Sequence, residues 1–151
     1  MNYSKTNNII GWACFLIATI TYVLTLEPSV SFWDCGEFIA SAYKMQVVHQ
    51  PGAPLFLMIE RFFSLLAMGD TSKIAYFMNF GSAVASGATI LFLFWTITAL
   101  AKKVLVKKGE EISSATLITI MGAGVVGALA YTYSDSFWFS AVEAEVYALS
   151  S

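Results

Sequence analysis

Three long runs without a charged residue constrain what this chain can fold into, at residues 7–26, 74–101 and 112–134. About 20 consecutive apolar residues in a helix cross the hydrocarbon core of a bilayer. The sequence is 58% hydrophobic and 12% charged, whereas soluble domains carry roughly 25% charged residues. We therefore predict an all-α integral membrane protein with three transmembrane helices, at about residues 8–26, 74–101 and 113–133.

The first run is interpreted as a retained span. It is longer than the apolar core of a signal peptide, and Glu27 and Pro28 follow it where a cleavable peptide would have small residues. The lysines of the chain then predict its orientation, because Lys and Arg concentrate in short cytoplasmic loops. Four of them lie between the second and third runs, namely Lys102, Lys103, Lys107 and Lys108.

Lys5 agrees with this orientation, so we expect a multi-pass protein of the inner (cytoplasmic) membrane with a cytoplasmic N-terminus. Residues 27–73 would then form an outside loop, and the chain after Ser134 would also lie outside. Eight of the ten acidic residues fall on that side: Glu27, Asp34, Glu37, Glu60, Asp70, Asp135, Glu143 and Glu145.

The outside loop contains helical patterns of its own. A short helix is expected to begin at Asp34, and residues 49–54 (HQPGAP) form a turn. Residues 55–68 are amphipathic and too short to span, which is typical of a helix lying along the membrane interface, with Glu60 and Arg61 toward headgroups or a cleft.

We treat residues 1–151 as a single membrane domain. Residues 137–151 begin another apolar helix, so we expect this chain to be the N-terminal part of a longer protein. Cys14 and Cys35 would lie at different membrane depths, and no disulfide is expected between them.

Asp34 and Glu37 are three residues apart and share one face of a helix. One interpretation is a capping box, in which Asp34 caps the helix and Glu37 occupies its third position. The other is an acidic pair that acts as a general base, binds a cation or holds a sugar hydroxyl. Spacing alone leaves both open.

Several further positions each have two possible interpretations. His49, the only histidine, precedes the turn and is either a hydrogen-bonded surface residue or a ligand-binding one. Arg61 either binds a lipid phosphate or extends its charge to the headgroups. Trp33 belongs either to an interfacial aromatic belt or to a sugar platform. Asp135, Glu143 and Glu145 are functional if buried near the membrane and merely solvated if they lie at its outer rim.

Two segments resemble a known family. PSVSFWDCGEFIASAYKMQVVHQPGAPLF closely resembles the first-loop signature of a family of multispanning GT-C membrane glycosyltransferases, well represented in Bacteroidetes, whose animal relatives are protein O-mannosyltransferases. SFWFSAVEAEVYALSS resembles a second signature of the same family. The resemblance implies the N-terminal part of a GT-C-type fold that takes a sugar, expected to be mannose, from a polyprenyl-phosphate carrier and transfers it to a protein hydroxyl.

The resemblance also implies residue roles. Asp34 would be the general base, Glu37 would assist it or bind the donor, and His49 would lie near the donor phosphate. Glu143 and Glu145 fall in the second signature, where donor or acceptor binding is expected. These 151 residues alone are expected to be inactive, because such a site needs later helices.

The implied partners are the lipid bilayer, the lipid-linked sugar donor and a protein acceptor. No basic patch interleaved with aromatic residues occurs, so nucleic acid is not expected as a partner. No second His or Cys is spaced to build a zinc site with His49; no metal ligands are assigned, and a divalent-metal requirement stays open. The alternative function is a non-catalytic membrane scaffold or a subunit of a larger complex. Transport is disfavoured because the three runs carry no charges.

Overall fold

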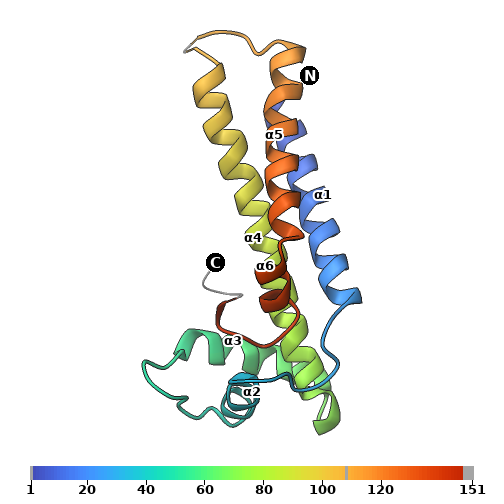
Figure 1. Cartoon of the computed structure of the whole chain (residues 1–151), viewed down its shortest axis with the longest axis vertical. Coiled ribbons are helices and arrows are strands. Elements are labelled where there is room, and N and C mark those ends of the chain that lie inside the picture. Colours follow the sequence, from blue (N-terminus) through green and yellow to red (C-terminus); the bar gives the residue numbers. More distant parts are fainter. Residues whose placement is uncertain (1, 108, 148–151) are drawn as a thin grey trace. The chain divides into compact units, whose positions relative to one another are not determined.

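The computed structural model describes residues 2–107 and 109–147. Within those residues the fold is entirely helical, which confirms the predicted class (Figure 1). Three helices are long and apolar enough to span a membrane: α1 (Tyr3–Leu24), α4 (Ile74–Leu105) with the 3₁₀ turn before it, and α5 (Ser114–Thr132). The described chain is thus that of a multi-pass membrane protein.

The helices differ from the predicted spans at their ends. α1 begins at Tyr3 rather than near residue 8 and ends at Leu24, before Glu27 and Pro28. α4 continues to Leu105, so its last turn includes Lys102 and Lys103, where positive charge is favourable at the negative end of the helix dipole. α1 and α4 extend into polar residues because backbone hydrogen bonds, rather than side-chain hydropathy, hold the turns of a helix together.

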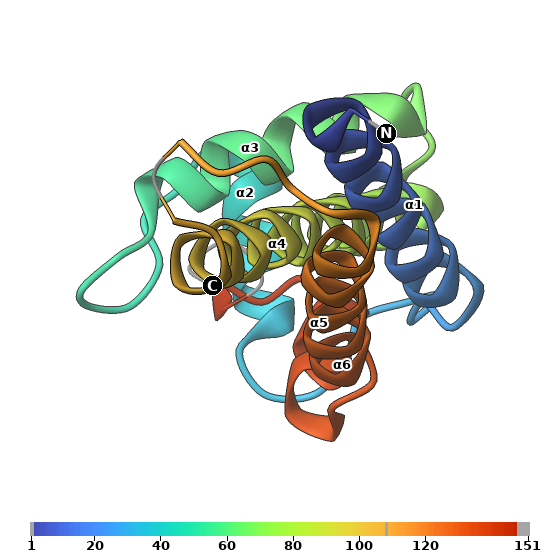
Figure 2. The same cartoon turned by 90° about the horizontal axis from the view of Figure 1, so that it is seen from above.

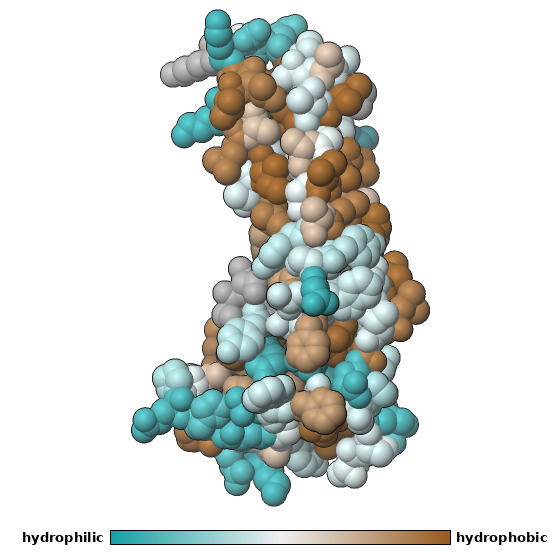
Figure 3. Space-filling model, in the orientation of Figure 1, coloured by the Kyte–Doolittle hydropathy of each residue, from teal (hydrophilic) through white to brown (hydrophobic). Residues whose placement is uncertain are grey.

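The chain divides into two compact units. We call residues 1–18 with 87–134 the bundle unit, and residues 19–86 with 135–151 the loop unit. On the face shown in Figure 3, hydrophobic residues dominate the surface of the bundle unit, apart from the connection between α4 and α5. Hydrophilic residues gather on the loop unit in the same view.

Glycine allows the helices of the bundle unit to approach closely. A Cβ atom at Gly124 of α5 would lie 2.6 Å from Thr98 Cγ2 and 2.7 Å from the Phe94 ring of α4. A Cβ at Gly11 of α1 would lie 2.7 Å from Trp95 Nε1. Such contacts suit helix association in lipid, where packing rather than water exclusion holds helices together.

Short helices build the loop unit. These are α2 (Cys35–Lys44), α3 (Pro54–Ser64) and α6 (Asp135–Ala141), with 3₁₀ turns at Leu65–Ala67 and Thr71–Lys73. α2 and α3 pack against each other, as both views show (Figure 1 and Figure 2). The buried residues between them include Phe38, Ile39, Phe56 and Leu57.

The segment after α5 differs from the expectation of one helix over 137–151. α6 begins earlier, at Asp135, and ends at Ala141, after which the chain turns. Its backbone returns toward the first loop: the Glu27 N–H donates to the Val142 carbonyl over 3.1 Å. Trp138 Nε1 donates to Thr25 Oγ1 over 3.0 Å. Residues 148–151 of the predicted helix lie outside the described part of the chain.

Candidate active site

The N-terminus of α2 brings the candidate acidic pair to the surface. Cys35, Phe38, Ile39 and Ala42 form the buried face of this helix. Asp34 and Glu37 are exposed, Asp34 at the edge of this buried face and Glu37 farther round the helix. The three- and four-residue spacing of the buried positions fixes this arrangement, because those positions share one face of an α-helix.

The capping-box interpretation is wrong. Asp34 occupies the N-cap position with helical backbone angles, φ −79° and ψ −7°, and within the described residues its side chain makes no cap hydrogen bond. An N-cap side chain normally accepts a backbone N–H from an extended backbone conformation, which Asp34 does not have. Neither carboxylate of the pair is therefore occupied by capping, and both remain available for other contacts.

Glu37 binds His49, twelve residues further along the chain. The His49 backbone N–H donates to Glu37 Oε1 over 2.8 Å, and His49 Nδ1 lies 2.9 Å from Oε2. The hydrogen bond to Glu37 raises the pKa of His49. The hydrogen bonds from His49 lower the pKa of Glu37. Because Asp34 Oδ2 lies 4.0 Å from His49 Nε2, the imidazole sits between two carboxylates.

The predicted turn presents the imidazole to this pair. The Gly52 N–H donates to the His49 carbonyl over 2.9 Å, and Gly52 has a φ of +83°, a conformation that glycine adopts without a steric penalty. The His49 ring also packs against Phe38, with ring centroids 5.8 Å apart. Backbone, ring and ion-pair contacts together hold one orientation of the side chain.

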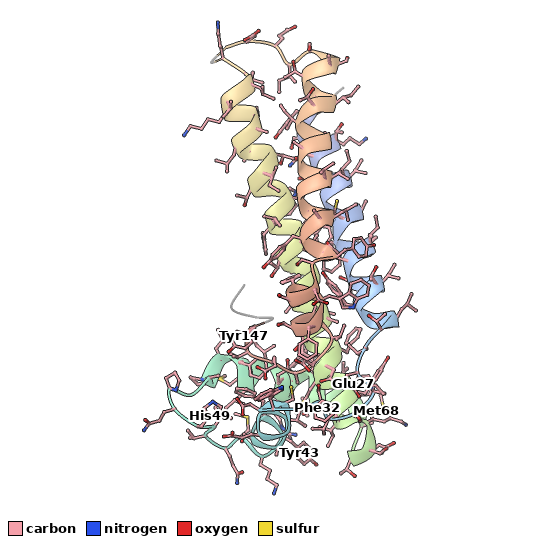
Figure 4. All side chains as sticks on the ribbon, in the orientation of Figure 1. Glu27, Phe32, Tyr43, His49, Met68 and Tyr147 are labelled. Atoms are coloured by element: carbon pink, nitrogen blue, oxygen red, sulfur yellow. The ribbon has the colours of Figure 1, made fainter. Side chains whose placement is uncertain are left out.

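A cavity of about 230 Å³ opens beside this histidine. Three segments line it: α2, the turn before α3 and the chain after α6. Figure 4 labels His49 and Tyr147, which are both lining residues. The full set of lining residues is Asp34, Phe38, Val48, His49, Pro51, Gly52, Ala53, Glu145, Val146 and Tyr147.

Glu143 and Glu145 are both buried, whereas the sequence left open whether they are buried or solvated. Glu143 is 5% exposed and Glu145 is 9% exposed. The Cys35 thiol donates to Glu145 Oε1 over 3.7 Å. Burial raises the pKa of Glu145, and burial with the nearby Glu143 and Glu145 carboxylates raises the pKa of Cys35 to about 12. Cys35 is therefore a packing residue with an unreactive thiol.

Asp34, Glu37 and His49 are residue types that bind metal ions, and they lie close together. One potential ligand atom from each residue lies within 4.8 Å of the others. All three side chains are exposed, and the imidazole nitrogen nearest Glu37 is already engaged by that carboxylate. The contacts are those of an ion-pair network, and we assign no metal to them.

Four predicted residues are not among those that line the cavity, namely Trp33, Glu37, Arg61 and Glu143. Trp33 has a left-handed backbone (φ +60°) and is 89% exposed. The Arg61 guanidinium lies over the Tyr43 ring, 5.0 Å from its centroid. Glu60, expected to face headgroups or a cleft, is instead fully buried, with Ser82 donating to its Oε1 over 3.4 Å. The prediction from the amphipathic pattern was wrong for Glu60, because the buried face of α3 consists of Phe56, Leu57 and Ser64 together with this carboxyl.

Sequence reasoning overlooked Cys35, Phe38 and Tyr147 as site residues. The helical spacing of Cys35 and Phe38 next to Asp34 was a usable signal for a buried face below the acidic pair. Tyr147 carried no such signal, because only the return of the chain after α6 brings it to the cavity. Both cysteines are free in the described structure, which confirms that no disulfide joins them.

In the described chain, three helices apolar enough to span a membrane and a cavity lined by Asp34, His49 and Glu145 define the class: a multi-pass membrane protein with an acidic candidate site. Residues 34–151 match the family described as the protein O-mannosyl-transferase TMEM260 N-terminal domain. The match covers most of the chain, and the chain belongs to this family. The resemblance to O-mannosyltransferases is therefore confirmed.

Two curated relatives are also named protein O-mannosyl-transferases. The chain is 26% identical over 137 residues to the protein O-mannosyl-transferase tmem260 of Dictyostelium discoideum, covering 91% of this chain and 15% of that protein. It is 26% identical over 139 residues to the mouse protein O-mannosyl-transferase TMEM260, covering 92% and 17%. The chain thus spans about a sixth of the length of these relatives. No solved structure matches it.

Proposed function

We propose that this chain carries the first-loop site of a mannosyltransferase that moves mannose from a polyprenyl-phosphate carrier to a protein hydroxyl outside the membrane. The observation that supports it is the cavity that joins Asp34 and His49 to the buried Glu145. The names of the family and of the relatives add the reaction class. The GT-C fold, the carrier, the inner-membrane location and the cytoplasmic N-terminus belong to this proposal.

Asp34 is the proposed general base. Its carboxylate is exposed at the cavity and, within the described chain, has no capping role to hold it against the helix. As the acceptor oxygen attacks the anomeric carbon, Asp34 takes the hydroxyl proton, and the bond from that carbon to the carrier phosphate breaks. General-base assistance of this kind contributes roughly 10²–10⁴-fold in rate.

His49 is the proposed contact for the departing phosphate. It is the one basic side chain among the described residues that line the cavity. Glu37 holds the imidazole through both its backbone and its ring, and the raised pKa of His49 keeps more of it protonated near neutral pH. Glu37 thus acts as a positioning residue, and His49 supplies the positive charge on which leaving-group stabilisation depends.

Glu145 is the proposed hydroxyl-binding residue of the cavity wall. A buried carboxyl that already accepts from Cys35 keeps further acceptor positions for sugar hydroxyls. The cavity is smaller than the roughly 300–1,000 Å³ typical of drug-sized ligands, which suits a single sugar ring. Glu143, two residues earlier in the chain, is also buried, and the exposed Trp33, adjacent to Asp34 in sequence, offers an aromatic face to the acceptor or sugar.

Substitution of Asp34 tests the proposal. In the intact protein, Asp34→Asn and Asp34→Ala should both reduce mannosyl transfer by roughly 10²–10⁴-fold. Folding should be nearly unchanged in both, because the side chain makes no cap bond in the described structure. Transfer is measured with a lipid-linked mannose donor and an acceptor protein, and folding by thermal unfolding.

The matched control is Asp135→Asn. Asp135 is also an exposed acidic residue in the first turn of an outside helix, but it does not line the cavity. Its substitution should leave transfer close to wild type. If Asp34→Asn also transferred mannose at close to the wild-type rate, Asp34 would not be the base and the proposed mechanism would be wrong.

A further inference from the structure

Helix α3 has two apolar faces, and only one of them is buried. Phe56, Leu57 and Ser64 pack into the loop unit together with the carboxyl of Glu60. The other face exposes Leu55, Met58, Phe62 and Leu65, with Phe62 66% exposed. Spacings of three and four residues place these four side chains in one stripe along the helix. We call this stripe the outer face of α3.

The outer face continues past the end of the helix. Leu66 and Met68 are also exposed, and Met68 is 93% exposed at the left-handed turn that ends the 3₁₀ segment (Figure 4). A contiguous apolar patch of this kind is uncommon on a surface that faces only water. It needs a partner whose chemistry matches both the stripe and its borders.

Arg61 forms one border of the outer face. Its guanidinium stacks over the Tyr43 ring and donates to Ser64 Oγ over 3.2 Å. Among the described residues, no carboxylate lies within ion-pair distance of it. A guanidinium has five N–H donors in a planar fork. Most of them are therefore left for an anion, and phosphate oxygens match the geometry of that fork.

The chain itself holds α3 near a bilayer. Six residues separate Ser64 from Thr71, the first residue of a segment long and apolar enough to span a membrane. Even fully extended, six residues reach roughly 25 Å at most, and here they include a 3₁₀ turn and two tight turns. The C-terminal end of the outer face is thus held within that distance of the start of this apolar segment.

We propose that α3 is a lipid-binding helix, whose outer face enters the acyl chains of the bilayer while Arg61 binds the phosphate of a phospholipid headgroup. The stripe supplies the apolar contact, and the guanidinium, which has no carboxylate partner among the described residues, supplies the charge complementarity. An amphipathic helix that lies in the interface combines these two contributions in the same way. The inference is independent of the chemistry proposed for Asp34.

Collision accessibility tests where the outer face lies. The intact protein, with Cys14, Cys35 and every other native cysteine replaced by alanine, receives a single cysteine-linked spin label at Phe62 in phospholipid nanodiscs. We expect oxygen, which concentrates in the acyl region, to reach this label severalfold more readily than a water-soluble nickel chelate does. The matched control is a label at Val47, an apolar residue that is 90% exposed in the loop before the turn, where the chelate should dominate.

Two results would overturn the proposal. A label at Phe62 that neither reagent reaches would show that another protein segment covers the outer face. A label reached mainly by the chelate would show that the face lies in water. Both outcomes differ from a failure of the mannosyltransferase mechanism, because the measurement requires no turnover.

The phosphate contact is tested by changing the lipid and the residue together. In bilayers of phosphatidylglycerol, Arg61→Ala should lower the oxygen accessibility of the Phe62 label, and Arg61→Lys should restore part of it. In phosphate-free galactolipid bilayers, the wild type and Arg61→Ala should give the same value. Lys44→Ala, which removes an exposed charge from the last turn of α2, serves as the control and should change nothing. Equal oxygen accessibility of the Phe62 label in wild type and Arg61→Ala in phosphatidylglycerol would show that Arg61 does not bind a lipid phosphate.

Discussion

The bundle unit and the loop unit satisfy their buried polar groups in different ways. In the bundle unit, Thr98 and Thr132 donate their hydroxyls to carbonyls of their own helices, at Trp95 and Ala128. In the loop unit, Asn79 and Glu145 bond across segments far apart in sequence: Asn79 donates to the carbonyls of Glu27 and Ser29, and Glu145 accepts from Cys35. These two hydroxyls of the bundle unit are thus satisfied within one helix, which suits a lipid environment. The loop unit depends on long-range polar contacts, and this is where the candidate site lies.

The comparison predicts that pH acts on the loop unit first. Burial raises the pKa of Glu60 to about 8, and Oε2 of this side chain has no hydrogen-bond partner among the described residues. A carboxyl whose folded pKa is raised contributes stability that is complete below its unfolded value near 4.5 and is lost as pH rises toward and through 8. We expect a loss on the order of 3–5 kcal/mol between about pH 5 and pH 9.

Unfolding of the intact protein at several pH values measures this loss, and Glu60→Gln provides the matched variant. Glutamine keeps the shape without the titration, so the part of the slope that comes from Glu60 should disappear. An identical pH slope in wild type and Glu60→Gln would show that the buried carboxyl does not control the stability of the loop unit.

The bundle unit should be sensitive to volume rather than to pH. Gly124→Ala places a methyl group 2.6 Å from Thr98 Cγ2 and 2.7 Å from the Phe94 ring, where one of the helices must move. Overpacking of this kind costs about 1–3 kcal/mol, and thermal unfolding in detergent measures it. The control is Gly122→Ala on the same helix, where no atom lies within 4 Å of the added carbon. Equal stability of the two variants would mean that α4 and α5 do not approach each other at Gly124.

Asn79 tests whether amide contacts hold the first loop onto α4. Its Nδ2 donates to the Glu27 carbonyl over 2.7 Å and to the Ser29 carbonyl over 3.0 Å. Asn79→Ala should destabilise the protein by about 1–2 kcal/mol and should speed amide exchange around Ser29. Asn8→Ala, at an exposed position of α1, should have little effect. Unchanged exchange near Ser29 in Asn79→Ala would contradict the assignment.

The smallest expected effect concerns the exposed pair of Glu37 and His49. Glu37→Gln removes the carboxylate that raises the pKa of His49, so the pKa should fall toward its ordinary value. Titration of the imidazole by NMR measures the shift, and Asp135→Asn is the control. An unchanged His49 pKa in Glu37→Gln would show that the pair does not form in solution.

The sequence by itself determined the membrane character of this protein. Uncharged runs of about 20 residues leave a helix in lipid as the favourable state, because a helix satisfies its backbone groups within one segment. Local signals also sufficed for the turn at His49 and for the start of α2 next to Asp34. Each of these features depends on residues close together in the chain.

Only the tertiary structure decided which polar groups meet. Cys35 contacts Glu145 across 110 residues of sequence, and Glu37 engages His49 rather than capping its own helix. Glu60 is buried because α3 packs the face that contains it against α4. The sequence of α3 has apolar residues on two faces, so it does not show which of them is buried. The physical reason is that long-range side-chain contacts form only when packing closes the intervening chain, and local spacing carries no information on that closure.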